Sequence, residues 1–133
     1  MKTRFAAALG SVALAAGMLL GAPAASAQTT AYPTTTVDVP YGASYIHGTL
    51  TWYNRSVGFN GTLRAVGCRR AWFAAYDASG NQFDARSTST KCDVTYPFSV
   101  SIPADAPGGA ASVVVCLDDA NAKPLKCVKY YRP

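Results

Sequence analysis

Alternation of apolar and polar side chains dominates the chain after residue 40. Residues 44–53, 57–65 and 98–102 each place apolar or glycine residues at every second position, with mostly polar side chains between them. A period of two is typical of a β-strand with one face in the core and the other in water. The pattern therefore predicts three strands, each with one buried face.

Two other segments are apolar throughout and predict strands deeper in the fold. Residues 71–76 are almost entirely apolar, and residues 111–117 carry three consecutive valines. Such runs are typical of central strands. We also expect strands at 82–87 and 125–131, turns at 54–56 and 77–81, and a connection between two sheets at 103–109, where two prolines and two glycines exclude a continuing strand.

These elements predict an all-β fold. Apolar residues after residue 27 never recur at helical spacing for three turns, and Glu is absent. Six to seven short antiparallel strands in about a hundred residues favour an immunoglobulin-like β-sandwich. Two hallmarks of true immunoglobulin domains are missing, because Trp72 follows Cys68 by only four residues and Val114 stands where a tyrosine is expected. The likeness is one of architecture and supports no activity by itself.

Residues 1–27 have the three parts of a secretory signal peptide. Lys2 and Arg4 precede an apolar run, which ends at the small-residue site 25–27. We expect cleavage after Ala27, a flexible leader at 28–37 and a single domain at 38–133. No later segment is apolar over a membrane-spanning length, so we predict a secreted, extracellular protein, and the Ala-rich, Glu-free composition suggests a bacterium of high GC content.

Four cysteines lie after the signal peptide, and this even number predicts a disulfide framework. Three pairings are possible. Cys116 and Cys127 flank the turn-like stretch 118–124, which favours a bond between them and leaves Cys68 to pair with Cys92. The alternative of a zinc site is disfavoured because no C-x-x-C pair occurs, and we expect no metal.

The charge of the chain does not point to a nucleic acid partner. Removing Lys2 and Arg4 from the 12 Lys and Arg residues leaves ten, against seven acidic residues, a net charge of about +3. The basic residues are scattered, and Arg69-Arg70 is the only adjacent pair. We interpret this charge as ordinary solubilising charge.

Signals for catalysis are weak, and we predict that the protein is not an enzyme and holds no cofactor. The single histidine, His47, is expected to be a half-exposed sheet residue, and no G-x-S-x-G motif accompanies it. Without Glu, a glycosidase pair would come from aspartates that stand in or beside predicted turns, namely Asp77, Asp84, Asp105, Asp118 and Asp119. Asp118, Asp119 and Asn121 also permit a calcium site, but a turn explains them more simply.

The residue types that recur in binding hot spots offer a candidate contact surface. They are Tyr45, Tyr53, Arg55, Arg69, Arg70, Tyr130, Tyr131 and Arg132. The leading hypothesis is a secreted, non-catalytic binding module for an extracellular protein or a cell-envelope polymer. The alternatives are a carrier of a small apolar ligand, in a cleft lined by Trp52, Trp72 and Phe73, and a small secreted hydrolase that depends on His47.

Overall fold

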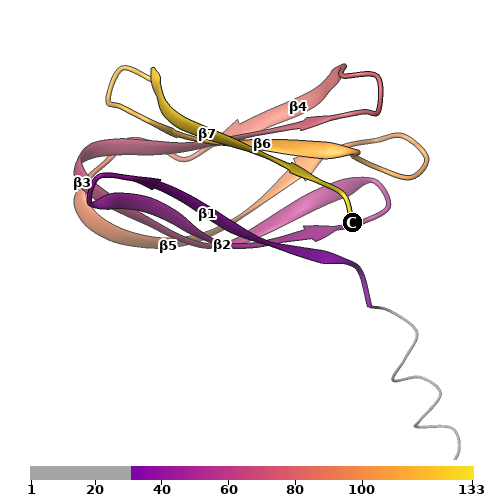
Figure 1. Cartoon of the computed structure of the whole chain (residues 1–133), viewed down its shortest axis with the longest axis horizontal. Coiled ribbons are helices and arrows are strands. Elements are labelled where there is room, and N and C mark those ends of the chain that lie inside the picture. The colour runs from indigo at the N-terminus through magenta and orange to yellow at the C-terminus, as the bar shows by residue number, and fades with distance from the viewer. Residues whose placement is uncertain (1–30) are drawn as a thin grey trace, which may run out of the picture. The chain divides into compact units, whose positions relative to one another are not determined.

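The computed structural model describes residues 31–133, which fold into antiparallel strands with no helix among them (Figure 1). The prediction of an all-β, antiparallel fold of six to seven strands is confirmed, although two of the expected strands form one and a strand at the start of the domain was not expected. The strands are β1 (Thr34–Tyr41), β2 (Ser44–Trp52), β3 (Ser56–Tyr76), β4 (Gln82–Ser87), β5 (Lys91–Pro103), β6 (Ser112–Asp118) and β7 (Pro124–Tyr131).

The strands form two layers that share β3 (Figure 1). In the first layer, which we call sheet A, β2 lies between β1 and the first part of β3, and β5 pairs with the other edge of β3. In sheet B, the second part of β3 lies between β4 and β6, and β7 pairs with β6. The segment between β5 and β6 therefore passes from one sheet to the other, as the prolines and glycines at 103–109 predicted.

The core lies between the two layers and is formed by the apolar face of each strand. Trp52, Phe59 and Phe73 are its largest fully buried side chains, and the rings of Phe59 and Phe73 lie 4.8 Å apart, centroid to centroid. The indole N–H of Trp52 donates a hydrogen bond of 2.9 Å to the hydroxyl of Thr35, which satisfies the one polar group of that buried ring.

Two glycines, one in β2 and one in β3, leave space in the core for the ring of Phe59. Gly48 and Gly61 face each other in the register of these strands. A Cβ on Gly61 would collide with the backbone oxygen of His47 and would lie 2.6 Å from the Cα of Gly48 and 2.7 Å from the Cζ of Phe59. The ring of Phe59 thus occupies the space that side chains at these two positions would fill.

Strand β3 bends from sheet A into sheet B at a β-bulge between Ala65 and Cys68. Gly67 adopts a φ of +78° there, a left-handed conformation that favours glycine. The prediction of separate strands at 57–65 and 71–76 was wrong, because residues 66–70 turn this corner without leaving the strand.

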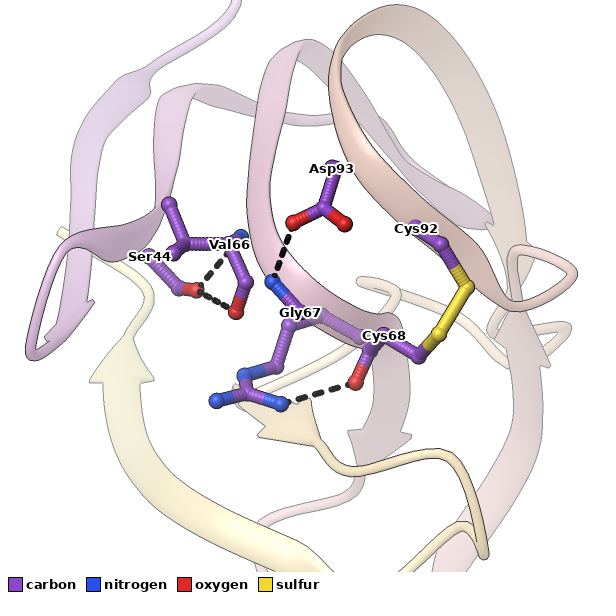
Figure 2. The surroundings of a disulfide bond; sticks show 7 residues. Ser44, Val66, Gly67, Cys68, Cys92 and Asp93 are labelled. Carbon is purple, nitrogen blue, oxygen red and sulfur yellow. Dashed lines mark hydrogen bonds between the residues drawn. A yellow bond between two sulfur atoms is a disulfide. The ribbon is translucent and has the colours of Figure 1, made fainter.

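Side chains from three strands hold the corner (Figure 2). The hydroxyl of Ser44 accepts a hydrogen bond of 3.0 Å from the N–H of Val66 and donates one of 3.3 Å to its carbonyl oxygen. The carboxylate of Asp93 accepts the N–H of Gly67 at 2.7 Å. The Cys68–Cys92 disulfide joins β3 to β5 beside these bonds. The corner is therefore fixed by hydrogen bonds and by a covalent link.

Both predicted disulfides are confirmed, and each joins residues that face each other on neighbouring strands. Cys68–Cys92 links β3 to β5 within sheet A, and Cys116–Cys127 links β6 to β7 within sheet B. Neither bond connects the two sheets, whereas the disulfide of antibody domains does so. Each bond therefore fixes the pairing of two strands within one layer.

The structure changes the predicted start of the domain. The compact unit begins at Tyr32, and residues 34–37 pair with β2. The prediction of a flexible leader was wrong for these four residues, because β1 buries Val37 and Val39 in the core. The predicted signal peptide, residues 1–27, lies outside the described residues. Residues 31–133 contain no helix with the length and apolar character needed to span a membrane.

Candidate binding surface

The outer face of sheet A carries an open hollow of about 360 Å³. This volume is within the range of small-molecule sites. Three neighbouring strands and the residue after β2 supply its lining, which consists of Thr51, Tyr53, Gly58, Phe59, Asn60, Ser99, Val100 and Ser101. The alternating pattern of the sequence predicts that Thr51, Asn60, Ser99 and Ser101 point away from the core. The structure confirms this orientation, because Thr51 is partly exposed and the other three are exposed.

The hollow lies where Gly58, near the start of β3, contributes no side chain to the face. Gly58 is the register partner of Thr51 on β2 and of Ser101 on β5. The ring of Tyr53 lies beside it, since a Cβ on Gly58 would approach this ring to 3.1 Å. Tyr53 is 39% exposed, and the ring of Tyr32 meets it edge-on with centroids 4.9 Å apart. The exposed ring of Tyr53 therefore lies next to the backbone of Gly58, which no side chain covers.

The other side chains of the hollow are neutral hydrogen-bonding groups. The hydroxyl of Ser99 donates to the amide oxygen of Asn60 at 3.1 Å, which leaves the amide N–H₂ of Asn60 free to donate to a ligand. None of the lining residues carries a formal charge at neutral pH. The hollow can thus provide ring stacking and several hydrogen bonds, but no ionic contact.

His47 lies on the same face of sheet A, among structural contacts. Its Nε2 lies 2.9 Å from the carboxylate of Asp38, its side chain is 52% exposed, and its ring stacks on Tyr45 with centroids 3.9 Å apart. The predicted half-exposed sheet position is confirmed.

Of the eight predicted binding residues, Tyr53 alone lines this hollow. Arg55 and Arg132 lie near it, at the end of the molecule where β2 turns into β3. Arg55 pairs with Asp105 at 2.7 Å. Arg132 donates hydrogen bonds to the carbonyl oxygens of Tyr53, at 3.0 Å, and Gly108, at 2.7 Å. These two arginines hold loops together.

Tyr130 and Arg70 also have partners within the domain. The hydroxyl of Tyr130 accepts the backbone N–H of Asp38 at 2.9 Å and donates to its carbonyl oxygen at 3.1 Å, which ties β7 to β1. Burial raises the pKa of this hydroxyl. Arg70 donates to the buried carboxylate of Asp118 through two nitrogens, at 2.9 and 3.1 Å. Burial raises the pKa of Asp118, and the hydrogen bonds from Arg70 oppose this effect.

The remaining three predicted residues lie apart. Tyr45 is half-buried at the start of β2, and Arg69 donates to the carbonyl oxygen of Cys68 at the corner. Tyr131 is 67% exposed on β7, in the other sheet. The eight residues therefore do not form one patch. Residue type alone selected them, and intramolecular contacts account for most of the arginines.

The residues predicted to line a ligand cleft are also separated. Trp52 and Phe73 are fully buried in the core. Trp72 pairs with Cys116 on β6 and lines a hollow with Arg70 on sheet B. The prediction of one cleft formed by Trp52, Trp72 and Phe73 was wrong, because neighbouring residues of a strand point to opposite faces.

Two of the acidic residues considered for catalysis or for calcium binding, Asp77 and Asp119, accept hydrogen bonds within turns. Asp119 accepts the backbone N–H groups of Asn121 and Lys123, and the bond from Lys123 is the main cause that lowers its pKa. Asp77 accepts the N–H groups of Ser79 and Asn81 in the turn after β3. Within residues 31–133, no group of three His, Cys, Asp or Glu residues is arranged to hold a metal ion.

The neutral hollow at Tyr53 is thus the concave site that best combines an aromatic ring with hydrogen-bonding groups. Comparison with known proteins adds no candidate function to this geometry. The chain matches no protein-family model, no curated protein and no solved structure.

Proposed function

We propose that the protein is a non-catalytic binding module that acts outside the cell and contacts its partner through the outer face of sheet A. The observation that carries this proposal is the hollow of about 360 Å³, in which the ring of Tyr53 stands beside neutral hydrogen-bonding side chains. A carrier of small molecules would instead enclose most of its ligand. An open site on a sheet face suits a partner larger than the site itself.

The rigidity of the face supports a binding role. The lining residues lie on or next to three paired strands, and the Cys68–Cys92 disulfide joins two of these strands. A surface that is ordered before binding loses little conformational freedom when the partner arrives. Two intact disulfides are also compatible with an oxidising, extracellular environment.

The proposal is tested by binding to fractions of the producing cell. Wild-type protein is incubated with purified cell wall and with concentrated culture medium, and saturable binding is measured. We expect Tyr53→Ala to weaken this binding at least about tenfold, since truncated hot-spot residues cost this much or more. Tyr131→Ala is the matched control, because it removes a more exposed tyrosine from the other sheet. Equal binding by both variants would refute the role of this face.

A second candidate function is supported by a smaller hollow of about 130 Å³ between β4 and β5. Phe73, Tyr96 and Phe98 line it, and the rings of Tyr96 and Phe98 stack with centroids 5.5 Å apart. This space is close to that of a single aromatic ring. A carrier role predicts that phenol or benzene shifts the NMR signals of these three rings in a saturable manner, and unchanged spectra would exclude it.

A further inference from the structure

We infer that the outer face of sheet A binds an uncharged saccharide chain, an inference that rests on the proposed function of this face. The first reason is the absence of charge in the hollow. Its polar side chains are the hydroxyls of Thr51, Ser99 and Ser101, the amide of Asn60 and the phenol of Tyr53. A charged ligand group that is partly desolvated here would have no counter-ion, which is costly.

Two of the basic side chains nearest to this face have acidic partners. His47 pairs with Asp38, and Arg55 pairs with Asp105. Arg64, the register partner of Tyr45 on the same face, donates to the hydroxyl of Thr95 at 3.2 Å. An acidic polymer would have to displace Asp38 and Asp105 in order to pair with His47 and Arg55, and only Arg64, whose partner is a neutral hydroxyl, is open to ionic pairing, so the face offers little to an acidic ligand.

The second reason is the combination of an aromatic ring with hydroxyls and an amide. A pyranose ring has an apolar side, where its C–H groups lie, and hydroxyls around its rim. The ring of Tyr53 offers a surface for the C–H groups. Asn60 and Ser101 offer both donors and acceptors for the rim hydroxyls. A saccharide therefore uses both kinds of group in the hollow.

A folded protein partner fits this face less well. The centres of protein interfaces are rich in aromatic residues, Met and Arg. Around the hollow on sheet A, the neighbours of Tyr53 are mainly Thr, Ser and Asn residues. The face therefore lacks the residue types that are enriched at the centre of a protein interface.

The third reason concerns the length of the ligand. Polar side chains continue from the hollow across the sheet, because Thr36 on β1 faces Thr49 on β2, Thr49 faces Asn60 on β3, and Asn60 faces Ser99 on β5. Neighbouring strands are about 4.8 Å apart, so this row spans about 14 Å. The row is longer than one sugar ring, which favours a chain over a monosaccharide.

The experiment measures binding isotherms for a panel of neutral polysaccharides, namely β-1,4-glucan, α-glucan, mannan, xylan and chitin, with polygalacturonate as the acidic comparator. We expect saturable binding to at least one neutral member. This binding should change little between about 0.05 M and about 1 M NaCl, since salt screens only charged contacts. Tyr53→Ala should weaken it at least about tenfold, whereas Tyr53→Phe and the control Tyr131→Ala should retain it.

A pair of charge insertions separates a neutral ligand from an ionic one. Ser101 is exposed at the rim of the hollow, so Ser101→Asp and Ser101→Lys alter the charge without altering the core. For a neutral saccharide, both variants should weaken binding. An anionic ligand would bind more tightly to Ser101→Lys and more weakly to Ser101→Asp, and this opposite response would overturn the inference. Circular dichroism of each variant verifies that it is folded.

The outcomes also separate this inference from the proposed function. If no neutral polysaccharide binds, while a component of the cell wall or medium is still bound in a manner that requires Tyr53, the saccharide inference is wrong and the binding role stands. If Tyr53→Ala leaves all binding unchanged, both are wrong.

Discussion

The close approach of β2 and β3 at Gly61 gives a sharp test of how this fold is held together. Replacing Gly61 by Ala adds one methyl group that would collide with the backbone oxygen of His47 and lie 2.6 Å from the Cα of Gly48. Backbone atoms in a central strand pair cannot move aside without breaking the ladder. We therefore expect a loss at the upper end of the overpacking range, about 3 kcal/mol of unfolding free energy. Domains of this kind have about 5 to 15 kcal/mol in total.

Gly42→Ala is the matched control for this substitution. Gly42 has a φ of +60°, and nothing lies within 4 Å of a Cβ built on it. The same chemical change there meets only the left-handed backbone conformation, which costs about 1 to 2 kcal/mol. The contrast between the two variants isolates the packing contribution at Gly61.

Urea denaturation followed by tryptophan fluorescence measures both variants, because Trp52 is fully buried. Gly61→Ala should lower the midpoint markedly more than Gly42→Ala. A smaller or equal loss at Gly61 would refute the reasoning. Phe59→Leu in the Gly61→Ala background adds a second check. Removing the ring that lies 2.7 Å from the new methyl should restore only part of the stability, and complete restoration would show that the ring, not the backbone, is limiting.

Three further predictions concern the disulfides, the buried ion pair and the contact between β1 and β7. Replacing Cys68 and Cys92, which are 24 residues apart, by Ala should lower the unfolding free energy in urea by about 3 kcal/mol in the chain-entropy model, and a loss below about 1 kcal/mol would contradict it. Arg70→Ala should cost about 2 kcal/mol at pH 7, because it leaves the carboxylate of Asp118 buried without its partner. Since burial raises the pKa of Asp118, its carboxylate is protonated at a higher pH in the folded state than in the unfolded chain. The stability lost through Arg70→Ala should therefore shrink as the pH falls from 7 to 4. A difference in urea midpoint between variant and wild type that stays constant over this range would contradict the prediction. Tyr130→Phe removes two hydrogen bonds to β1 and should cost about 1 kcal/mol, with faster amide exchange in β1 but not in β2.

Periodicity in the sequence was sufficient to predict most strands, but not their continuity or the first of them. Residues 66–70 obscured the corner of β3, because a bulge and a glycine with positive φ interrupt the alternation of apolar and polar residues. Strand β1 was missed because only Val37 and Val39 mark its buried face among three threonines, Asp38 and Pro40. The corner depends on Ser44 and on Cys92 and Asp93, which are distant from it in sequence.

The candidate site was less predictable than the fold. A search for tyrosine and arginine found Tyr53 but also Arg70 and Arg132, whose hydrogen bonds bind them to this chain. The hollow itself lies where Gly58, between Thr51 and Ser101, contributes no side chain, and hot-spot composition does not select such residues. The alternation of polarity was sufficient to predict that Thr51 and Ser101 face solvent. Only the pairing register of the strands shows that both lie beside Gly58.

The passage of β3 through both layers also determines how the domain comes apart. Because one backbone segment supplies ladder partners to β2 and β5 in sheet A and to β4 and β6 in sheet B, no cut between the layers leaves two complete halves. Loss of either layer removes hydrogen bonds from the same strand and exposes the apolar core face of the other layer to water. Denaturation should accordingly be a single all-or-none transition, and a fragment that lacks residues 56–76 has no central strand around which either half can reassemble.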